Sequence, residues 1–319
     1  DKTQTLEVKE DGEVDMDWQY QGPVYEMKDQ PVTYGTSWEL PILLPVSNKA
    51  GTVTKYAFFI SPAPAGMADN KVYYFIGDFD VDTGKFIPDE RFDNKPALLD
   101  YGSNVFTGPS AFVDPESGDV CMFSIMQDQR SGAEEGGAGW AHCVGLTRNI
   151  WLNDEGTDLK MRPAKALHKL EGEVLAEGKN LTLEQANEKL ASVKGDLLYV
   201  RVIFTPQQGK EFGIELKTGE TRDRSWYTYR MEDETICADT KNKGSAASTN
   251  HVSGALALDH GKLAAEIYID RSLIEAFFND EKSISMRSYS GYESQGMQLF
   301  ADGKVSVDEL YVSEMKGIY

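Results

Sequence analysis

Short apolar runs separated by turn sequences fill the first half of this 319-residue chain. Residues 55–61 (KYAFFIS), 72–77 (VYYFIG) and 120–125 (VCMFSI) are such runs, and residues 114–118 (DPESG) form a typical turn between two of them. A spacing of about 8–12 residues between turns indicates an all-β fold. Four-stranded blades around a central axis would give this rhythm, so residues 1–157 are predicted to form part of a β-propeller.

A polar segment follows, and residues 158–175 are predicted to be a linker. Residues 176–319 are predicted to form a β-sandwich that begins with a short helix. Thr182 and Gln185 have the spacing of a helix-capping box, and apolar residues recur after them on one helical face. Alternating apolar runs then predict antiparallel strands at residues 197–204, 212–216, 226–231, 255–258, 262–269, 272–278 and 305–312.

The composition restricts the partners that the chain can have. A net charge of -20 and a pI near 4.6 are a poor match to nucleic acid or to an anionic membrane, whereas a neutral sugar remains compatible. No run approaches the roughly 18 apolar residues of a membrane span. Cys121, Cys143 and Cys237 show no zinc-ligand spacing, so neither a metal nor a cofactor is predicted.

One acidic residue has an unusual context. Glu39 lies between Trp38 and the Leu40-Pro41 pair, and an apolar run at residues 42–44 follows. An acid in such surroundings is expected to be poorly solvated, which would raise its pKa. A raised carboxyl pKa suits a general acid that protonates a leaving group near neutral pH. The alternative is an ordinary exposed glutamate at the edge of a strand.

Six motifs occur in one order along the chain. They are residues 37–46 (SWELPILLPV), 72–80 (VYYFIGDFD), 99–114 (LDYGSNVFTGPSAFVD), 139–146 (GWAHCVGL), 170–174 (LEGEV) and 268–278 (YIDRSLIEAFF). This series resembles glycoside hydrolase family 32, the invertases, inulinases and levanases, from about residue 13 to the C-terminus. The resemblance implies a five-bladed β-propeller followed by a β-sandwich, with the active site in the axial funnel of the propeller.

The resemblance also implies a retaining mechanism that uses two carboxylates. Glu39 takes the place of the acid/base in the family's Trp-Glu-Cys-Pro motif, with Leu40 in place of the cysteine. The family's nucleophile motif, Trp-x-Asn-Asp-Pro, and its Arg-Asp-Pro motif do not occur before Glu39. We therefore expect a partial propeller that lacks its first blades. A second chain or a missing N-terminal segment would complete it.

Three further residues are predicted to contact the substrate. Asp100 matches a family segment in which an acid reaches toward the sugar beyond the cleaved bond. The alternative is a turn aspartate before Gly102. Trp38 and Phe106 are predicted to stack on a sugar face, although aromatic residues at strand ends also build cores. Asp154 mimics the nucleophile motif, but it follows the acid/base and fits a tight turn.

These observations favour a β-fructosidase that hydrolyses sucrose, inulin or levan through a fructosyl-enzyme intermediate. The alternatives are a non-catalytic propeller-sandwich remnant that binds fructan, and a protein with no carbohydrate role. The sequence leaves open which fructan is used, whether cleavage is exo or endo, and whether water accepts the fructosyl group. The chain begins at Asp1 without an apolar leader, so we expect a processed or truncated product, and a secreted or cytoplasmic location stays open.

Overall fold

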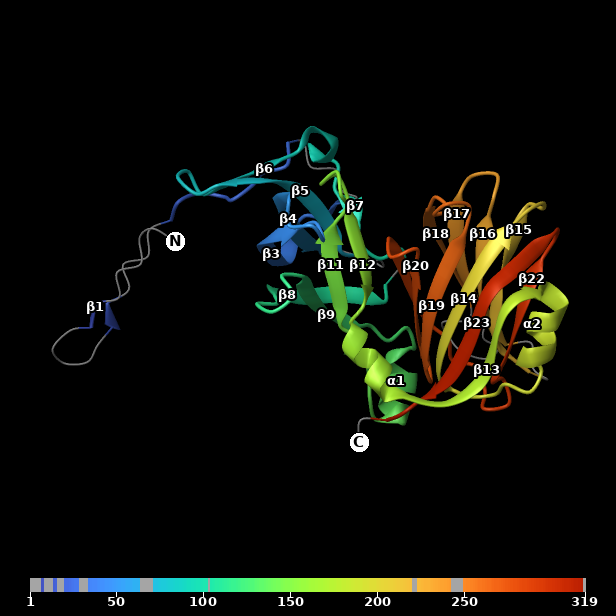
Figure 1. Ribbon diagram of the computed structural model, residues 1–319. Helices are drawn as coiled ribbons and strands as arrows, with labels where there is room; N and C mark the ends of the chain where they lie inside the picture. Colours follow the sequence, from blue (N-terminus) through green and yellow to red (C-terminus); the bar gives the residue numbers. More distant parts are fainter. Residues whose placement is uncertain are drawn as a thin grey trace.

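The computed structural model describes residues 7–8, 14–15, 20–28, 34–63, 71–102, 104–219, 223–241 and 249–317. These residues form an all-β fold with four large sheets and a separate ribbon of two short strands (Figure 1). The ribbon pairs β1 (Glu7–Val8) with β2 (Val14–Asp15). Residues 16–19, in the stretch before Glu39, lie outside the described residues.

The first sheet is an antiparallel meander in which consecutive strands are neighbours. A short strand, β7, pairs with β5 off the main path, and a 3₁₀ turn at Glu90–Phe92 precedes it. The strands are β3 (Trp38–Ser47), β4 (Thr54–Pro62), β5 (Tyr73–Asp80), β6 (Lys85–Pro88) and β7 (Ala97–Leu98).

The second sheet has the order β10-β9-β11-β12, and β8 pairs with β9 along its whole length, on the edge opposite to β10 and β11. A short helix, α1 (Gly132–Ala138), lies between β9 and β10. The first and second sheets share one hydrophobic core. The strands are β8 (Phe106–Val113), β9 (Val120–Met126), β10 (Cys143–Val144), β11 (Arg148–Leu152) and β12 (Leu159–Pro163).

The second half of the chain forms two antiparallel sheets that face each other across a second core (Figure 1). The third sheet has the order β13 (Glu171–Thr182), β23 (Val305–Met315), β14 (Leu197–Pro206), β19 (Leu263–Asp270), β20 (Leu273–Phe278) and β21 (Lys282–Arg287). The fourth has the order β18 (Thr249–Ala255), β17 (Thr235–Lys241), β16 (Arg224–Arg230), β15 (Glu211–Thr218) and β22 (Gly296–Ala301).

The predicted helix is confirmed as α2 (Leu183–Leu190), and Thr182 and Gln185 form the expected capping box. The segment predicted as a linker is shorter than expected. β12 continues to Pro163 and β13 begins at Glu171, so the connection between them is a 3₁₀ turn at Lys165–Leu170. The prediction missed β13 because half of the residues of this edge strand are exposed and only one is buried, so its sequence is that of a polar segment.

The strand predicted at residues 255–258 is wrong, because β18 ends at Ala255. Leu256 lies in the following loop, yet it is 3% exposed and belongs to the sandwich core. A buried loop residue gives the same local sequence signal as a short strand.

One face of the second sheet lacks a covering layer among the described residues. Alternate residues of β9 are buried in the shared core, whereas Phe123 and Ile125 on the opposite face are 40% and 42% exposed. Phe112 of β8 is 50% exposed and stacks on Phe123, with ring centroids 6.4 Å apart. Val144 of β10 is 71% exposed. We call these four residues the open apolar face. Such contiguous apolar surface marks a site of interaction with another layer.

Candidate active site

Glu39 lies near the start of β3, paired with Ser61 of β4. The regular register is interrupted between Glu39 and Ile42, and Leu40 inside this irregularity has a φ of 48°. Leucine rarely adopts this left-handed conformation. Bulges of this kind re-aim side chains and are over-represented next to active sites. The backbone at this point therefore sets the direction of the Glu39 side chain.

The Glu39 side chain is exposed, so the expectation of a poorly solvated acid beside Trp38 is not met. The physical reason is the period of a strand, in which neighbouring residues point to opposite faces. Trp38 packs into the aromatic cluster of the first sheet, and Glu39 points away from it. The carboxylate is therefore accessible to a substrate or to another part of an active site.

Trp38 is part of an aromatic cluster rather than an open platform. Its Nε1 donates a hydrogen bond to the carbonyl oxygen of Tyr34 at 2.8 Å. Its ring stacks on Tyr25 with centroids 6.2 Å apart, and the rings of Phe58 and Phe75 lie at 6.2 and 5.9 Å. These contacts are those of an aromatic residue that builds a core, which was the alternative to sugar stacking. A sugar-stacking role for Trp38 stays a prediction.

Asp100 is 2% exposed and lies where the first half of the chain meets the sandwich. Its Oδ1 accepts hydrogen bonds from the backbone N–H groups of Gly102 and Ser285, at 2.8 and 3.0 Å. Its Oδ2 accepts one from Arg148 Nη1 at 2.8 Å and one from Ser283 Oγ at 2.7 Å. Both oxygens are thus used inside the protein. The structure places Asp100 as a turn residue and an interior ion-pair partner, and does not bring it to an open substrate surface.

Phe106 begins β8 and is 1% exposed. The guanidinium carbon of Arg148 lies 4.0 Å from the centroid of its ring, a close cation–π contact. No sugar can reach this ring in the observed conformation, so the predicted stacking role requires a correction: Phe106 packs under a buried cation.

Gly108, two residues later, faces Leu40, because a Cβ atom built on it would lie 3.2 Å from Leu40 Cδ1. The beginnings of β3 and β8 therefore lie side by side.

Arg148 is the residue that sequence reasoning missed. It is completely buried on β11 and lies between two buried carboxylates. Nη1 pairs with Asp100 at 2.8 Å, and Nη2 pairs with Glu275 at 3.0 Å. The Ser283 and Ser285 hydroxyls accept further hydrogen bonds from Nη1 and Nη2, both at 2.8 Å. A Thr-Arg-Asn sequence entering a strand gives no local sign of this role.

Glu275 lies in the 268–278 motif of the sequence, and its contacts are structural. Besides Arg148, it accepts a hydrogen bond from the backbone N–H of Leu146 at 2.8 Å. Burial raises the pKa of the Glu275 carboxyl, and the charge of Arg148 opposes this rise. Glu275 therefore joins the sandwich to the second sheet through an ion pair in the interior.

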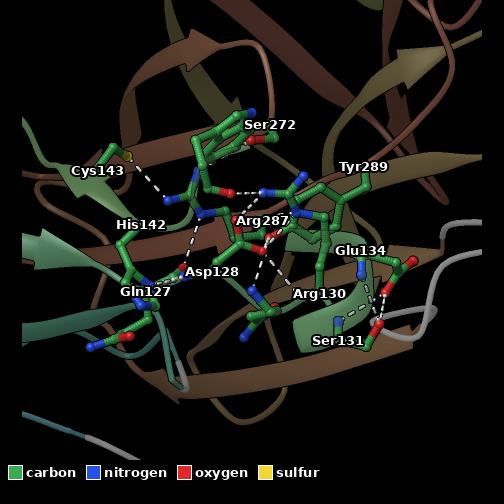
Figure 2. A network of polar contacts seen from close by, with 12 residues as sticks. Gln127, Asp128, Arg130, Ser131, Glu134, His142, Cys143, Ser272, Arg287 and Tyr289 are labelled. Carbon is green, nitrogen blue, oxygen red and sulfur yellow. Dashed lines mark hydrogen bonds and ion pairs between the residues drawn. The ribbon is translucent and has the colours of Figure 1, made fainter. Parts of the chain in front are cut away.

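A second polar network joins the loop after β9 to the sandwich (Figure 2). Arg287 Nη2 donates to the carbonyl oxygen of Met126 at 2.7 Å and lies 3.1 Å from Cys143 Sγ. Tyr289 Oη donates to Asp128 Oδ1 at 2.8 Å. Arg130 Nη2 donates to Asp128 Oδ2 at 2.6 Å, and its guanidinium carbon also lies 4.1 Å from the centroid of the Trp140 ring. The network holds the loop at a fixed position against the sandwich.

The same loop is tied to the beginning of β8 and carries two exposed rings. Gln127 Nε2 donates to Thr107 Oγ1 at 3.0 Å, which fixes the end of β9 against the start of β8. His142 accepts a hydrogen bond from the backbone N–H of Asp128 at 2.9 Å through Nδ1. Trp140 is 47% exposed. This part of the loop therefore exposes the Trp140 and His142 rings to solvent.

Asp154 lies in the exposed turn between β11 and β12, where Gly156 has a φ of 71°. Asp154 is thus a turn residue, as the alternative to the nucleophile motif predicted.

Within the described ranges, no group of three or more His, Cys, Asp or Glu side chains could hold a metal ion, and all three cysteines are free. The described helices include none that is long and apolar enough to cross a membrane.

Comparison with models of known families identifies the family of this chain. The model for the glycosyl hydrolases family 32 N-terminal domain matches residues 14–163, and the model for the family 32 C terminal matches residues 166–314. The chain belongs to glycoside hydrolase family 32. Because the N-terminal domain model matches, the family comparison does not show that the first blades are absent.

The chain is also similar in sequence to individual proteins. The chain is 26% identical to a levanase of Bacillus subtilis over 303 residues, which is 90% of this chain and 44% of the levanase. It is 26% identical to fructan 1-exohydrolase w3 of Triticum aestivum over 168 residues, or 52% of this chain and 26% of that protein. The chain thus spans less than half the length of either relative.

Solved structures confirm the fold of family 32. The exo-inulinase of Aspergillus awamori superposes with a TM-score of 0.73 at 18% identity, covering 97% of this chain and 61% of the inulinase. Fructan 1-exohydrolase IIa of Cichorium intybus superposes with a TM-score of 0.72 at 16% identity, covering 88% of this chain and 62% of that enzyme. The all-β arrangement predicted from the sequence is confirmed, whereas the number of blades stays a prediction.

Proposed function

We propose that this chain is part of a retaining β-fructosidase that hydrolyses fructosyl bonds in sucrose, inulin or levan. Glu39 is the acid/base: it protonates the leaving oxygen and then deprotonates the incoming water. The nucleophilic aspartate lies outside residues 1–319, since the family's nucleophile and Arg-Asp-Pro motifs do not occur before Glu39.

The observation that carries this proposal is the position of Glu39. It combines an exposed carboxylate, a strand start and a backbone irregularity with a left-handed Leu40. It also lies within the region that matches the family 32 N-terminal domain. A catalytic acid has to reach its substrate from a rigid element, and β3, paired along its length with β4, supplies one.

The open apolar face supports the proposal that further blades complete the propeller. The second sheet packs one face against the first sheet, and leaves Phe112, Phe123, Ile125 and Val144 exposed on the other. Blades of a propeller pack against neighbours on both faces. We therefore propose that the strands up to Pro163 are the last blades of a five-bladed propeller, and that the sandwich begins at Glu171. The covering blade comes from an N-terminal segment or from a second chain.

The proposal is tested by hydrolysis assays on sucrose, inulin and levan. A retaining glycosidase needs two carboxyl groups about 5–5.5 Å apart, so residues 1–319 alone should release no reducing sugar above background. Addition of a polypeptide that supplies the remaining blades and their aspartate should restore hydrolysis. In that complex, Glu39→Gln should lower kcat by about 10²–10⁴-fold, the usual contribution of a general acid/base.

Glu116→Gln is the matched control, because Glu116 is an exposed glutamate in the turn between β8 and β9. It should leave the rate unchanged. Full activity of Glu39→Gln in the complex would overturn the assignment of Glu39. Robust hydrolysis by residues 1–319 alone would place the nucleophile within this chain, and fructan binding without hydrolysis in the complete complex would favour a non-catalytic remnant.

A further inference from the structure

A row of polar and aromatic side chains crosses the fourth sheet. Five neighbouring strands place Gln298, Glu215, Trp226, Asp239 and His251 opposite one another in register. Alternate residues of a strand point to opposite faces. Residues next to the row along each strand belong to the sandwich core, namely Ile214, Leu216, Tyr227, Ala238, Val252, Met297 and Leu299. The row therefore lies on the outer face of the sheet.

This face is remote from the candidate active site. The third sheet lies between the fourth sheet and the first half of the chain, since Tyr199, Tyr268 and Phe277 of the third sheet belong to the core that the first two sheets share. A ligand on the outer face of the fourth sheet would not meet Glu39.

Hydrogen bonds join the polar groups of the row in pairs. Gln298 Nε2 donates to Glu215 Oε2 at 2.5 Å, and His251 Nδ1 lies 2.7 Å from Asp239 Oδ1. The two carboxylates occupy the strands on either side of half-buried Trp226. Their side chains are 18% and 23% exposed, and Arg224 Nη1 lies 3.4 Å from Glu215 Oε1. Groups held in place beforehand lose less conformational entropy when a ligand binds.

A cavity of about 740 Å³ adjoins one end of the row. Glu215 and Gln298 belong to the row and also line the cavity. Arg224 and Lys241 line another part of the cavity. The guanidinium carbon of Arg224 also lies 5.2 Å from the centroid of the Trp226 ring, which restricts the orientation of the ring. Cavities of about 300–1,000 Å³ with a few fixed polar groups are typical of small-ligand sites.

We propose that the row and the adjoining cavity form an accessory binding site for a neutral oligosaccharide. The C–H face of a sugar ring matches the apolar face of Trp226, and its hydroxyls match the carboxylate and amide groups on both sides of that ring. A polyanionic ligand is disfavoured by the net charge of -20. The site stands on its own geometry, and the assignment of its ligand as a fructan rests on the proposed function.

The test is electrophoresis of the chain in native gels that contain levan, inulin or an unrelated neutral β-glucan. Levan or inulin should slow the wild type, and Trp226→Ala should weaken this binding by about ten-fold or more, equivalent to about 1.4 kcal/mol. Trp226→Phe keeps an aromatic face and should retain most of the binding. Tyr20→Ala is the matched control, because Tyr20 is an aromatic residue of the first half of the chain that is 88% exposed, and this variant should bind as the wild type does.

Thermal unfolding of each variant checks that it is folded, and Asp239→Asn provides a second test should Trp226→Ala be unstable. The inference is overturned if no glycan slows the wild type, or if folded Trp226→Ala or Asp239→Asn is slowed as much as the wild type. Retardation by the unrelated glucan alone, lost in Trp226→Ala, would support the accessory site while counting against fructan as the substrate class.

Discussion

Replacement of Arg148 by methionine is expected to destabilise the fold strongly. Methionine fills a similar volume but carries no charge. The Asp100 and Glu275 side chains, each 1% exposed, would therefore lose their cation at a site shielded from water. Removal of one partner from a buried ion pair typically costs about 3–5 kcal/mol, because the remaining charge stays desolvated. The loss of the cation–π contact with Phe106 adds to this cost. We expect a decrease of about 3–5 kcal/mol in the free energy of unfolding at pH 7.

The effect should also depend on pH. Burial already raises the pKa of Glu275 in the wild type, and without Arg148 the pKa should rise further. A carboxyl whose pKa is raised in the folded state binds more protons when folded, so stability falls as pH rises between the unfolded and folded pKa values. The deficit of Arg148→Met should therefore be largest at neutral pH and should shrink on acidification.

Guanidinium-induced unfolding, followed by tryptophan fluorescence between pH 5 and pH 8, measures both quantities. Arg271→Met is the matched control, because Arg271 pairs with Asp270 in an exposed turn where the two side chains are 72% and 59% exposed. Exposed pairs contribute about 0–1 kcal/mol, so this control should change stability little. A deficit of less than about 1 kcal/mol for Arg148→Met, or one that does not vary with pH, would refute the role given to the buried guanidinium.

Two further substitutions test local features of the structure. Burial alone would raise the pKa of Asp128, but hydrogen bonds from Arg130 and Tyr289 hold that pKa well below its usual range. The ionised carboxylate therefore stabilises the fold above its unfolded pKa, and this stabilisation is lost as pH falls through the folded pKa. Asp128→Asn should therefore lower the unfolding free energy by about 2 kcal/mol at pH 7, with a smaller difference in acid, and a pH-independent difference in denaturant titrations would contradict this. Thr182→Ala removes the cap of α2 and should cost about 1 kcal/mol, whereas an unchanged denaturation midpoint would show that tertiary packing alone holds the helix.

Features that depend on nearby residues could be predicted from the sequence. The helix over Leu183–Leu190 was predictable because its cap, Thr182, and the capping-box partner, Gln185, lie three positions apart. Most strands of both halves were predictable because alternation and turn residues are local signals. The motif around Glu39 was recognisable for the same reason, since its residues are consecutive.

The roles of Asp100 and Phe106 required the tertiary structure. Both residues depend on Arg148, which lies more than 40 positions later, and Asp100 also depends on Ser283 and Ser285, more than 180 positions away. No local pattern reports which distant side chain will share a buried space. The accessory row around Trp226 is similar, since its five residues come from five strands and meet through sheet register alone.

The position of Glu39 depends both on the local sequence and on the tertiary structure. The sequence by itself determined that a carboxylate begins a strand beside an aromatic residue, because that information is covalent and local. The tertiary structure decided that Trp38 packs into the aromatic cluster while Glu39 stays exposed, because which face of a strand is buried depends on the layers that pack against it. The same reason separates the packed face of the second sheet from its open apolar face: both faces are apolar in sequence, and only the neighbouring layers distinguish them.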